Sequence, residues 1–301
     1  DASAARGDIA LARDVSPAQQ AATAVAEATA WRAQAGAKAL LGRLRAQPAL
    51  PSVDFNERRV VLEAGDTMLS MLQQWATSPE ELSRLNPGLD PTRLEAGASI
   101  VVWRAEPDRP SASVGTPSRG RLENGYPMPA SDAWTVRRAA MSWGTESTVR
   151  AIAEGYLHVA EAHPGGGTPL IADLSRRRGG YAPPHRSHRS GRDVDATYYR
   201  LDPTLTGTWS HVTAATMDVE RQWALFAYWI EREQVDFIFV SPSISRALEV
   251  HARSIGVPEA TLARTFGTGL YDGIIRHERG HADHYHARFR CADGDERCRN
   301  R

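Results

Sequence analysis

Two short windows of the sequence concentrate side chains that can bind a metal ion or move protons. The first, HRSHRSGRDVD at 185–195, holds two histidines and two aspartates among three arginines, and the second, HADHYH at 281–286, holds three histidines. All ten histidines lie after residue 157. A salt-bridged surface loop would explain the first window alone, whereas two distant clusters also suit a metal site assembled by the fold. Imidazole and carboxylate ligands suit zinc, and three protein ligands beside an open position mark a catalytic site.

The spacing inside each window predicts how these side chains are presented. In an extended strand, residues two apart point to the same face. His284 and His286 therefore share one face, and so do Asp193 and Asp195. The second window continues as YHARFR, in which apolar and polar residues alternate, and the first continues as VDATYY, whose residue types favour strands. Both patterns predict a strand. Two such strands side by side would present imidazole and carboxylate on one shared surface.

Other residues near the windows allow more than one interpretation. Asp193 either orients a ligand histidine from behind or pairs with a neighbouring arginine, and we favour the salt bridge. Three arginines of the first window are expected to face solvent, although one near a cleft could receive a substrate carboxylate: Arg186, Arg189 and Arg192. Three downstream aromatics are expected in the core rather than in a substrate wall: Tyr198, Tyr199 and Trp209. Five further histidines are interpreted as ordinary: His158, His163, His211, His251 and His277.

Composition is that of an ordinary globular protein. The 301 residues suggest one large or two smaller domains, with 42% apolar and 24% charged residues. The formal net charge is zero, so composition does not indicate a nucleic acid or an anionic membrane as partner. The sequence contains no run of 18 apolar residues, so no transmembrane segment is predicted. The chain begins at Asp1 without a methionine or an apolar leader, which suggests a processed or trimmed end.

The sequence before residue 121 divides into three parts. Residues 1–55 are expected to form an N-terminal helical segment, because 17–47 is alanine-rich and bounded by prolines. Residues 56–103 predict strand, helix, helix and strand, with SPEEL placing Ser78 as N-cap and Glu81 in a capping box. Residues 104–120 are rich in proline, serine and glycine, which predicts a linker. Residues 121–301 are expected to form one compact domain.

The 56–103 segment resembles the lysin-motif (LysM) module. It has Gly-Asp-Thr after the first strand, Asn-Pro after the second helix and Leu-x-x-Gly before the last strand. The resemblance implies binding of N-acetylglucosamine units in peptidoglycan or chitin. The alternative is a small structural domain without sugar binding.

The large domain also resembles a known family. His188, six residues and Asp195, followed by His284-x-His286, match a pattern shared by lysostaphin-type peptidases, D-alanyl-D-alanine carboxypeptidases and the hedgehog fold. With ADLSRRRGG, FIFVSPSISRAL, LENGYPMP and Trp-Gly-Thr at 143–145, the sequence resembles penicillin-insensitive murein endopeptidases over roughly residues 120–301. Ala172 departs from an expected glycine, which leaves the ligand positions intact.

The resemblance assigns a role to each histidine of the two windows. It implies zinc held by His188, Asp195 and His286, with His185 as an additional or alternative ligand. His284 would be the general base and His281 a second imidazole that stabilises the tetrahedral intermediate. Zinc would lower the pKa of a bound water to about 7 and polarise the scissile carbonyl.

The two cysteines, Cys291 and Cys298, allow two states when considered by themselves. They can close a small loop in an oxidising compartment and would stay free in the cytosol. Their spacing also agrees with the murein endopeptidase resemblance, which implies a disulfide between them.

Together these observations predict an α+β fold. A central, mainly antiparallel sheet with flanking helices would carry the zinc site, beside a small βααβ domain and an N-terminal helix. The expected function is zinc-dependent hydrolysis of D-alanyl–meso-diaminopimelyl cross-links of peptidoglycan, in the periplasm or after secretion, with the module anchored on glycan. The alternatives are a zinc D,D-carboxypeptidase that trims terminal D-alanine, and a non-catalytic peptidoglycan-binding protein with structural zinc.

Overall fold

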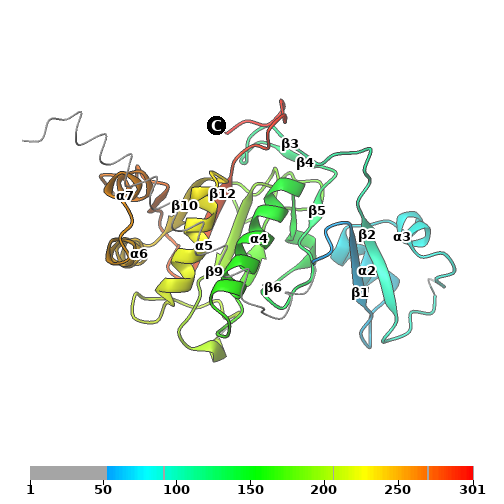
Figure 1. Cartoon of the computed structure of the whole chain (residues 1–301). Coiled ribbons are helices and arrows are strands. Elements are labelled where there is room, and N and C mark those ends of the chain that lie inside the picture. Colours follow the sequence, from blue (N-terminus) through cyan, green and yellow to red (C-terminus); the bar gives the residue numbers. More distant parts are fainter. Residues whose placement is uncertain (1–52, 91, 206, 270, 301) are drawn as a thin grey trace, which may run out of the picture.

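The computed structural model describes residues 53–300 apart from 91, 206 and 270. The predicted N-terminal helix within 1–55 lies outside these residues. The described part contains six α-helices and a mixed sheet, so the α+β class is confirmed (Figure 1). Among the described residues, no helix has the length and apolar character needed to cross a membrane.

The large domain is built on a six-stranded sheet in the order β11-β10-β12-β9-β8-β6 (Figure 1). The four inner strands are antiparallel neighbours, whereas β11 and β6 pair in parallel at the two edges. The sheet is therefore mainly antiparallel, as predicted. Its strands are β6 (Thr135–Val136), β8 (Leu170–Asp173), β9 (Asp193–Thr197), β10 (Val235–Val240), β11 (Ile275–His277) and β12 (His284–Phe289).

Helices cover one face of this sheet. Helices α4 (Glu146–Ala162) and α5 (Val219–Glu231) contact each other and lie in front of it in Figure 1. Thr145 caps α4 and Asp218 caps α5, each accepting a backbone N–H three residues on. Helices α6 (Pro242–Ser254) and α7 (Glu259–Phe266) pack beside β11.

The core on the helical face fixes which side chains of β12 point away from it. The Tyr285 hydroxyl lies 2.6 Å from that of Tyr156, and the Phe289 ring lies 5.3 Å from Trp229. Tyr285 and Phe289 are 0% and 2% exposed, and burial of each contributes about 1.5–3 kcal/mol. Because strand side chains alternate, this packing turns His284 and His286 to the opposite face. The strands predicted at both windows are confirmed.

The small module has the predicted order of elements. It consists of β1 (Glu57–Val61), α2 (Met68–Trp75), α3 (Pro79–Leu85) and β2 (Ser99–Arg104), with β1 and β2 paired antiparallel. Ser78 caps α3 by accepting the Glu81 N–H at 3.2 Å, as predicted. The reciprocal half of the predicted capping box is absent, because the Glu81 carboxylate binds Thr77 and Arg177 instead. A complete capping box occurs at Thr67 and Ser70 of α2.

Part of the predicted linker at 104–120 is regular structure. Residues 112–114 form β3 (Ala112–Val114), which pairs with β4 (Arg121–Glu123). The Ser113 N–H donates to Asp295, and Gly115 exchanges backbone hydrogen bonds with Arg297 and Arg299. The carboxyl-terminal segment that holds these contacts contains the Cys291–Cys298 disulfide. The local composition predicted a linker because it carries no information about these tertiary contacts.

Short elements complete the large domain. Three of them lie near the module: β5 (Tyr126–Pro127), η1 (Ala139–Met141) and β7 (Trp143–Gly144). The fourth is η2 (Pro203–Leu205). The Trp103 ring of β2 lies 4.8 Å from Tyr126 and 6.5 Å from Trp143, so the cores of the two domains are continuous.

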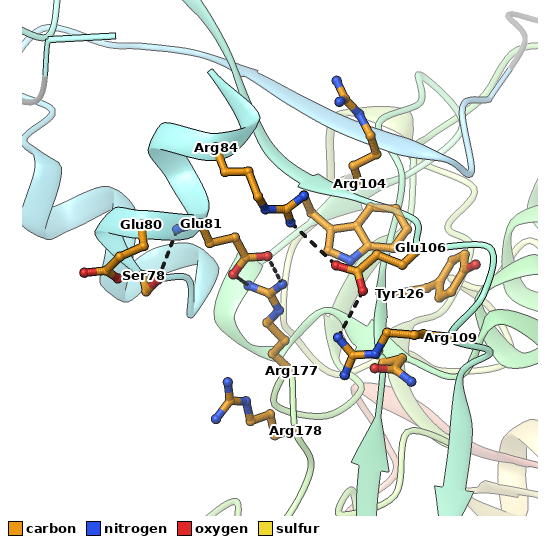
Figure 2. Close-up of a pocket in the computed structure, with 13 residues that line it drawn as sticks. Ser78, Glu80, Glu81, Arg84, Arg104, Glu106, Arg109, Tyr126, Arg177 and Arg178 are labelled. Atoms are coloured by element: carbon orange, nitrogen blue, oxygen red, sulfur yellow. Dashed lines mark hydrogen bonds and ion pairs between the residues drawn. The ribbon is translucent and has the colours of Figure 1, made fainter. Parts of the chain in front are cut away.

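An ion pair joins the module to the loop between β8 and β9 (Figure 2). Arg177 donates to both carboxylate oxygens of Glu81, at 2.5 and 3.0 Å, and to the Ala76 carbonyl. Its guanidinium also lies 5.0 Å from the Trp143 ring. The same loop carries His185 and His188, so the module helps to position the first histidine window.

We expect Glu81→Gln to lower the free energy of unfolding by about 1 kcal/mol at pH 7, because the amide loses the charge attraction and one acceptor. Burial raises the pKa of Glu81, but Arg177 outweighs it and the net pKa is lowered. A lowered carboxyl pKa stabilises the fold at pH values above about 4.5, and this contribution is lost as the pH falls through the lowered value. Melting temperatures of wild type and variant should therefore differ at pH 7 and converge in acid.

Glu249→Gln is the matched control, because it breaks an exposed pair with Arg253 within α6. Equal melting temperatures for wild type and Glu81→Gln at pH 7 would contradict the role given to this pair.

Candidate active site

Three donor atoms from separate segments converge on the sheet face opposite the helices. His188 Nε2 lies 3.3 Å from Asp195 Oδ1 and 3.2 Å from His286 Nδ1, and the last two atoms are 2.8 Å apart. Asp195 on β9 and His286 on β12 are direct partners in the strand register. All three side chains are buried. Ligands about 2.0–2.2 Å from a tetrahedral zinc lie about 3.3 Å apart, which is close to this spacing.

The outer hydrogen bond of His188 directs a lone pair into the centre. His188 Nδ1 lies 2.7 Å from the Leu174 carbonyl, which can only accept, so a neutral His188 presents its lone pair at Nε2. His286 Nε2 lies 3.3 Å from Asp193 Oδ1 as an ion pair, without a well-aligned hydrogen bond. The third atom is a carboxylate oxygen. Three buried acceptors this close together require a cation between them, either a proton or a metal ion.

His185 extends this group. Its Nδ1 lies 3.5 Å from Asp195 Oδ2, and with His188 and Asp195 it forms a group whose donor atoms all lie within 4.8 Å of one another. Its Nε2 lies within hydrogen-bond distance of Asp173 Oδ2, at 2.9 Å. Asp173 also accepts hydrogen bonds from the Arg138 guanidinium at Oδ1 and Oδ2, at 2.6 and 2.7 Å. The structure thus brings together all four side chains that the sequence indicated as ligands.

Backbone conformation and Asp193 place His188. His188 has a φ of 62°, a left-handed conformation uncommon in residues with a Cβ, and Gly191 has a φ of 75°. The His188 N–H donates to Asp193 Oδ2 at 2.8 Å, which holds this turn closed. Asp193 also accepts from Arg288 at 2.7 Å. The predicted salt bridge and the predicted contact with a histidine are therefore both present.

Two further histidines stand beside the converging atoms. His281 and His284 have ring centroids 4.8 Å apart, and His281 lies 6.2 Å from His286. His284 Nδ1 lies 2.6 Å from Asp283 Oδ1, which leaves Nε2 free to accept a proton. His281 Nδ1 lies 3.1 Å from the Arg279 carbonyl. Burial and the neighbouring histidines lower the pKa of His281, so its Nε2 also presents a lone pair.

The charges of the buried cluster shift its pKa values. Burial lowers the pKa of His286, but Asp193 and Asp195 outweigh this and raise it to about 9. Burial likewise lowers the pKa of His188, but Asp195 outweighs this effect and the net pKa is raised. For both carboxyls burial raises the pKa, yet the nearby cations hold it well below its ordinary range. The aspartates are therefore ionised, and the raised pKa of His286 favours its protonated form when no metal ion is bound.

Several neighbours differ from the sequence predictions. Arg192 was expected in solvent, but it is 1% exposed and donates to the carbonyls of Phe289 and Arg299. Arg186 is exposed as expected, and Arg189 is half-buried against Tyr181. Tyr198 and Tyr199 are core residues, as expected.

Trp209 was assigned to the core but is 37% exposed. Its ring stacks on His284 with centroids 4.5 Å apart, and Arg137 covers it at 5.4 Å. Sequence reasoning also missed Asp173 and Asp283 as histidine partners, although Asp173 lies in the ADLSRRRGG stretch and Asp283 within HADHYH.

One comparison with known proteins decides the family. The pattern of the family described as penicillin-insensitive murein endopeptidase matches residues 113–301, well over half of the chain. The chain belongs to the penicillin-insensitive murein endopeptidase family. No curated protein matches the chain significantly. As a member of this family it is a peptidase that acts on peptidoglycan, and the converging side chains lie inside the matched region.

We expect the chelator-treated protein to become less stable between pH 6.5 and 9.5. A histidine pKa raised to about 9 stabilises the fold fully below about pH 6.5, and the contribution is lost as the pH rises through 9. The melting temperature should fall by roughly 5 °C over this range. A flat profile, or the same slope in His286→Gln, would argue against the protonated cluster.

We expect Trp209→Ala to lower kcat/KM for murein hydrolysis by roughly tenfold, because His284 loses a stacked ring worth about 0.5–1.5 kcal/mol. Trp209→Phe keeps a ring and should retain most activity. Digestion of purified sacculi, followed by chromatography of the products, measures both. Full activity of Trp209→Ala would show that the stacking does not position His284.

Proposed function

We propose that this chain is a zinc-dependent murein endopeptidase that hydrolyses D-alanyl–meso-diaminopimelyl cross-links of peptidoglycan. The observation that carries the proposal is the convergence of His188 Nε2, Asp195 Oδ1 and His286 Nδ1, with two more imidazoles beside them. The donor set of nitrogen and oxygen atoms and its spacing fit zinc. His188, Asp195 and His286 would hold it, with His185 as an additional or alternative ligand.

Zinc, when bound, would supply an activated water near neutral pH and polarise the scissile carbonyl. The side chains around the ligands would do the remaining work. His284, with Nδ1 committed to Asp283, would accept the proton of the attacking water at Nε2 and return it to the leaving amine. Asp283 would stabilise the imidazolium formed between these two transfers.

His281 would act on the tetrahedral intermediate. Its neutral form presents an acceptor at Nε2, so it can donate a hydrogen bond to the oxyanion only after taking up a proton. That proton would come from solvent, because the proton taken up by His284 goes to the leaving amine.

Asp193 and Asp173 would orient the ligand histidines. A carboxylate behind a metal-bound imidazole fixes its ring and raises its basicity. Asp193 stands behind His286 and Asp173 behind His185. The module of residues 56–103 would bind the N-acetylglucosamine of the glycan strand, as its likeness to LysM modules suggests. The disulfide and the substrate favour the periplasm or the cell exterior.

We expect His286→Ala to abolish zinc binding and to lower endopeptidase activity by at least about 10³-fold, because it removes a ligand from the centre. His284→Ala should retain zinc but lose about 10²–10⁴-fold in kcat. Mass spectrometry of digested sacculi, with and without chelator, measures conversion of dimeric muropeptides to monomers.

His251→Ala on α6 is the control, since it removes an imidazole far from the cluster in the fold. Free D-alanine in place of monomeric muropeptides would indicate a carboxypeptidase. Zinc binding with no product of either kind would indicate a structural site, and undiminished activity of His286→Ala would refute the proposed ligand set.

A further inference from the structure

A pocket of about 690 Å³ lies where the module meets the large domain. One wall comes from β1 and α2 of the module, and the other comes from residues 136–142 of the large domain. It is distinct from the pocket of Figure 2. In that pocket Arg177 pairs with Glu81, and both Arg84 and Arg109 pair with Glu106. The module wall lies outside the region matched by the family.

The pocket of β1, α2 and 136–142 carries an excess of positive charge. Four arginines line it, Arg58, Arg59, Arg137 and Arg138, against two carboxylates. Arg59 pairs with Glu57 and Arg138 with Asp173. Among the described residues, no carboxylate pairs with the guanidinium of Arg58 or Arg137, and each guanidinium lies over an aromatic ring. Two guanidinium groups are therefore available to an anionic ligand.

The module wall also contains donors without acceptors. Arg58 is half-buried, and its Nε has no hydrogen-bond partner among the described residues. Its guanidinium lies 5.4 Å from the ring of Trp75, which is 4% exposed and whose indole nitrogen also has no acceptor. Both of these nitrogens are shielded from solvent, so Arg58 would offer a ligand the terminal nitrogens of its guanidinium.

The opposite wall connects directly to the histidine cluster. Arg137 lies over Trp209, whose ring stacks on His284. Arg138 holds Asp173, which receives the hydrogen bond of His185 Nε2. Two side chains would thus lie between a ligand in the pocket and the candidate base, and two between it and a candidate metal ligand.

We propose that this pocket is a subsite for a carboxylate-bearing stem peptide of peptidoglycan, with Arg58 and Arg137 receiving its free carboxylate. The proposal rests on the proposed substrate. Planar guanidinium groups bind carboxylates through two parallel hydrogen bonds, whereas N-acetylglucosamine carries no charge that would require them. The apolar lining from Val60 and Val61 suits the aliphatic parts of a peptide. A polymer held by both domains has to cross their junction, and the pocket lies there.

Binding can be measured separately from catalysis. The full chain carrying His286→Ala, which cannot cleave, is titrated with a synthetic stem tetrapeptide that has free carboxylates, and with the same peptide amidated. The free acid should bind at least about tenfold more tightly than the amide, and Arg58→Gln should weaken its binding by about tenfold. The affinity of Arg58→Lys for the free acid should fall between that of the protein with Arg58 and that of Arg58→Gln, because lysine keeps the charge but lacks the paired donors.

Arg84→Gln, which removes the same charge from the pocket of Figure 2, should leave the dissociation constant unchanged. Equal binding of acid and amide, or equal losses in Arg84→Gln and Arg58→Gln, would overturn the proposal. Displacement of the peptide by N-acetylglucosamine oligomers would also overturn it, since it would identify a glycan site.

A second readout uses the active protein on sacculi. Arg58→Gln should raise KM by about tenfold with little change in kcat, because Arg58 touches bound substrate away from the reacting bond. An unchanged KM would show that the substrate does not use the pocket. Loss of zinc-dependent cleavage in the unmodified chain would instead refute the proposed function, so the two failures are distinguishable.

Discussion

The site depends on three buried atoms that face one another and can each present a lone pair. His188 Nε2, His286 Nδ1 and Asp195 Oδ1 lie within 3.3 Å of one another. Without a proton or a metal ion between them this arrangement is repulsive, because each atom then acts as an acceptor. His188 Nδ1 is committed to the Leu174 carbonyl, so that ring cannot relieve the repulsion by changing tautomer at no cost, whereas His286 can relieve it by donating from Nδ1 to Asp195.

The sheet register sets this convergence. Asp195 and His286 are opposite one another on β9 and β12, and a slip of β12 by one residue would turn His286 to the helical face. The aromatic packing of Tyr285 against Tyr156 and Phe226 prevents such a slip. The core on one face therefore defines the polar site on the other. The same strands also bring Asp193 behind His286, so one register supplies both the ligand and its orienting carboxylate.

Local patterns predicted the parts of the site that lie within single strands. The two-residue spacing of Asp193 and Asp195, and of His284 and His286, fixed their common faces, and the family resemblance indicated that the strands meet. Three features were not predictable in this way: the burial of Arg192, the hydrogen bond between Asp173 and His185, and the exposure of Trp209. Each depends on residues far away in the sequence, with which no local periodicity connects it.

The loop between β8 and β9 shows how the module contributes to the candidate active site. Residues 174–192 contain no helix and no strand of the sheet, yet they carry His185 and His188. Irregular segments longer than about 12–15 residues are uncommon in compact domains unless function requires them. This one is held from outside, by Glu81 of the module through Arg177 and by the Pro117 carbonyl through the Arg189 N–H. The module is thus a structural support of two candidate ligands, as well as a candidate glycan-binding domain.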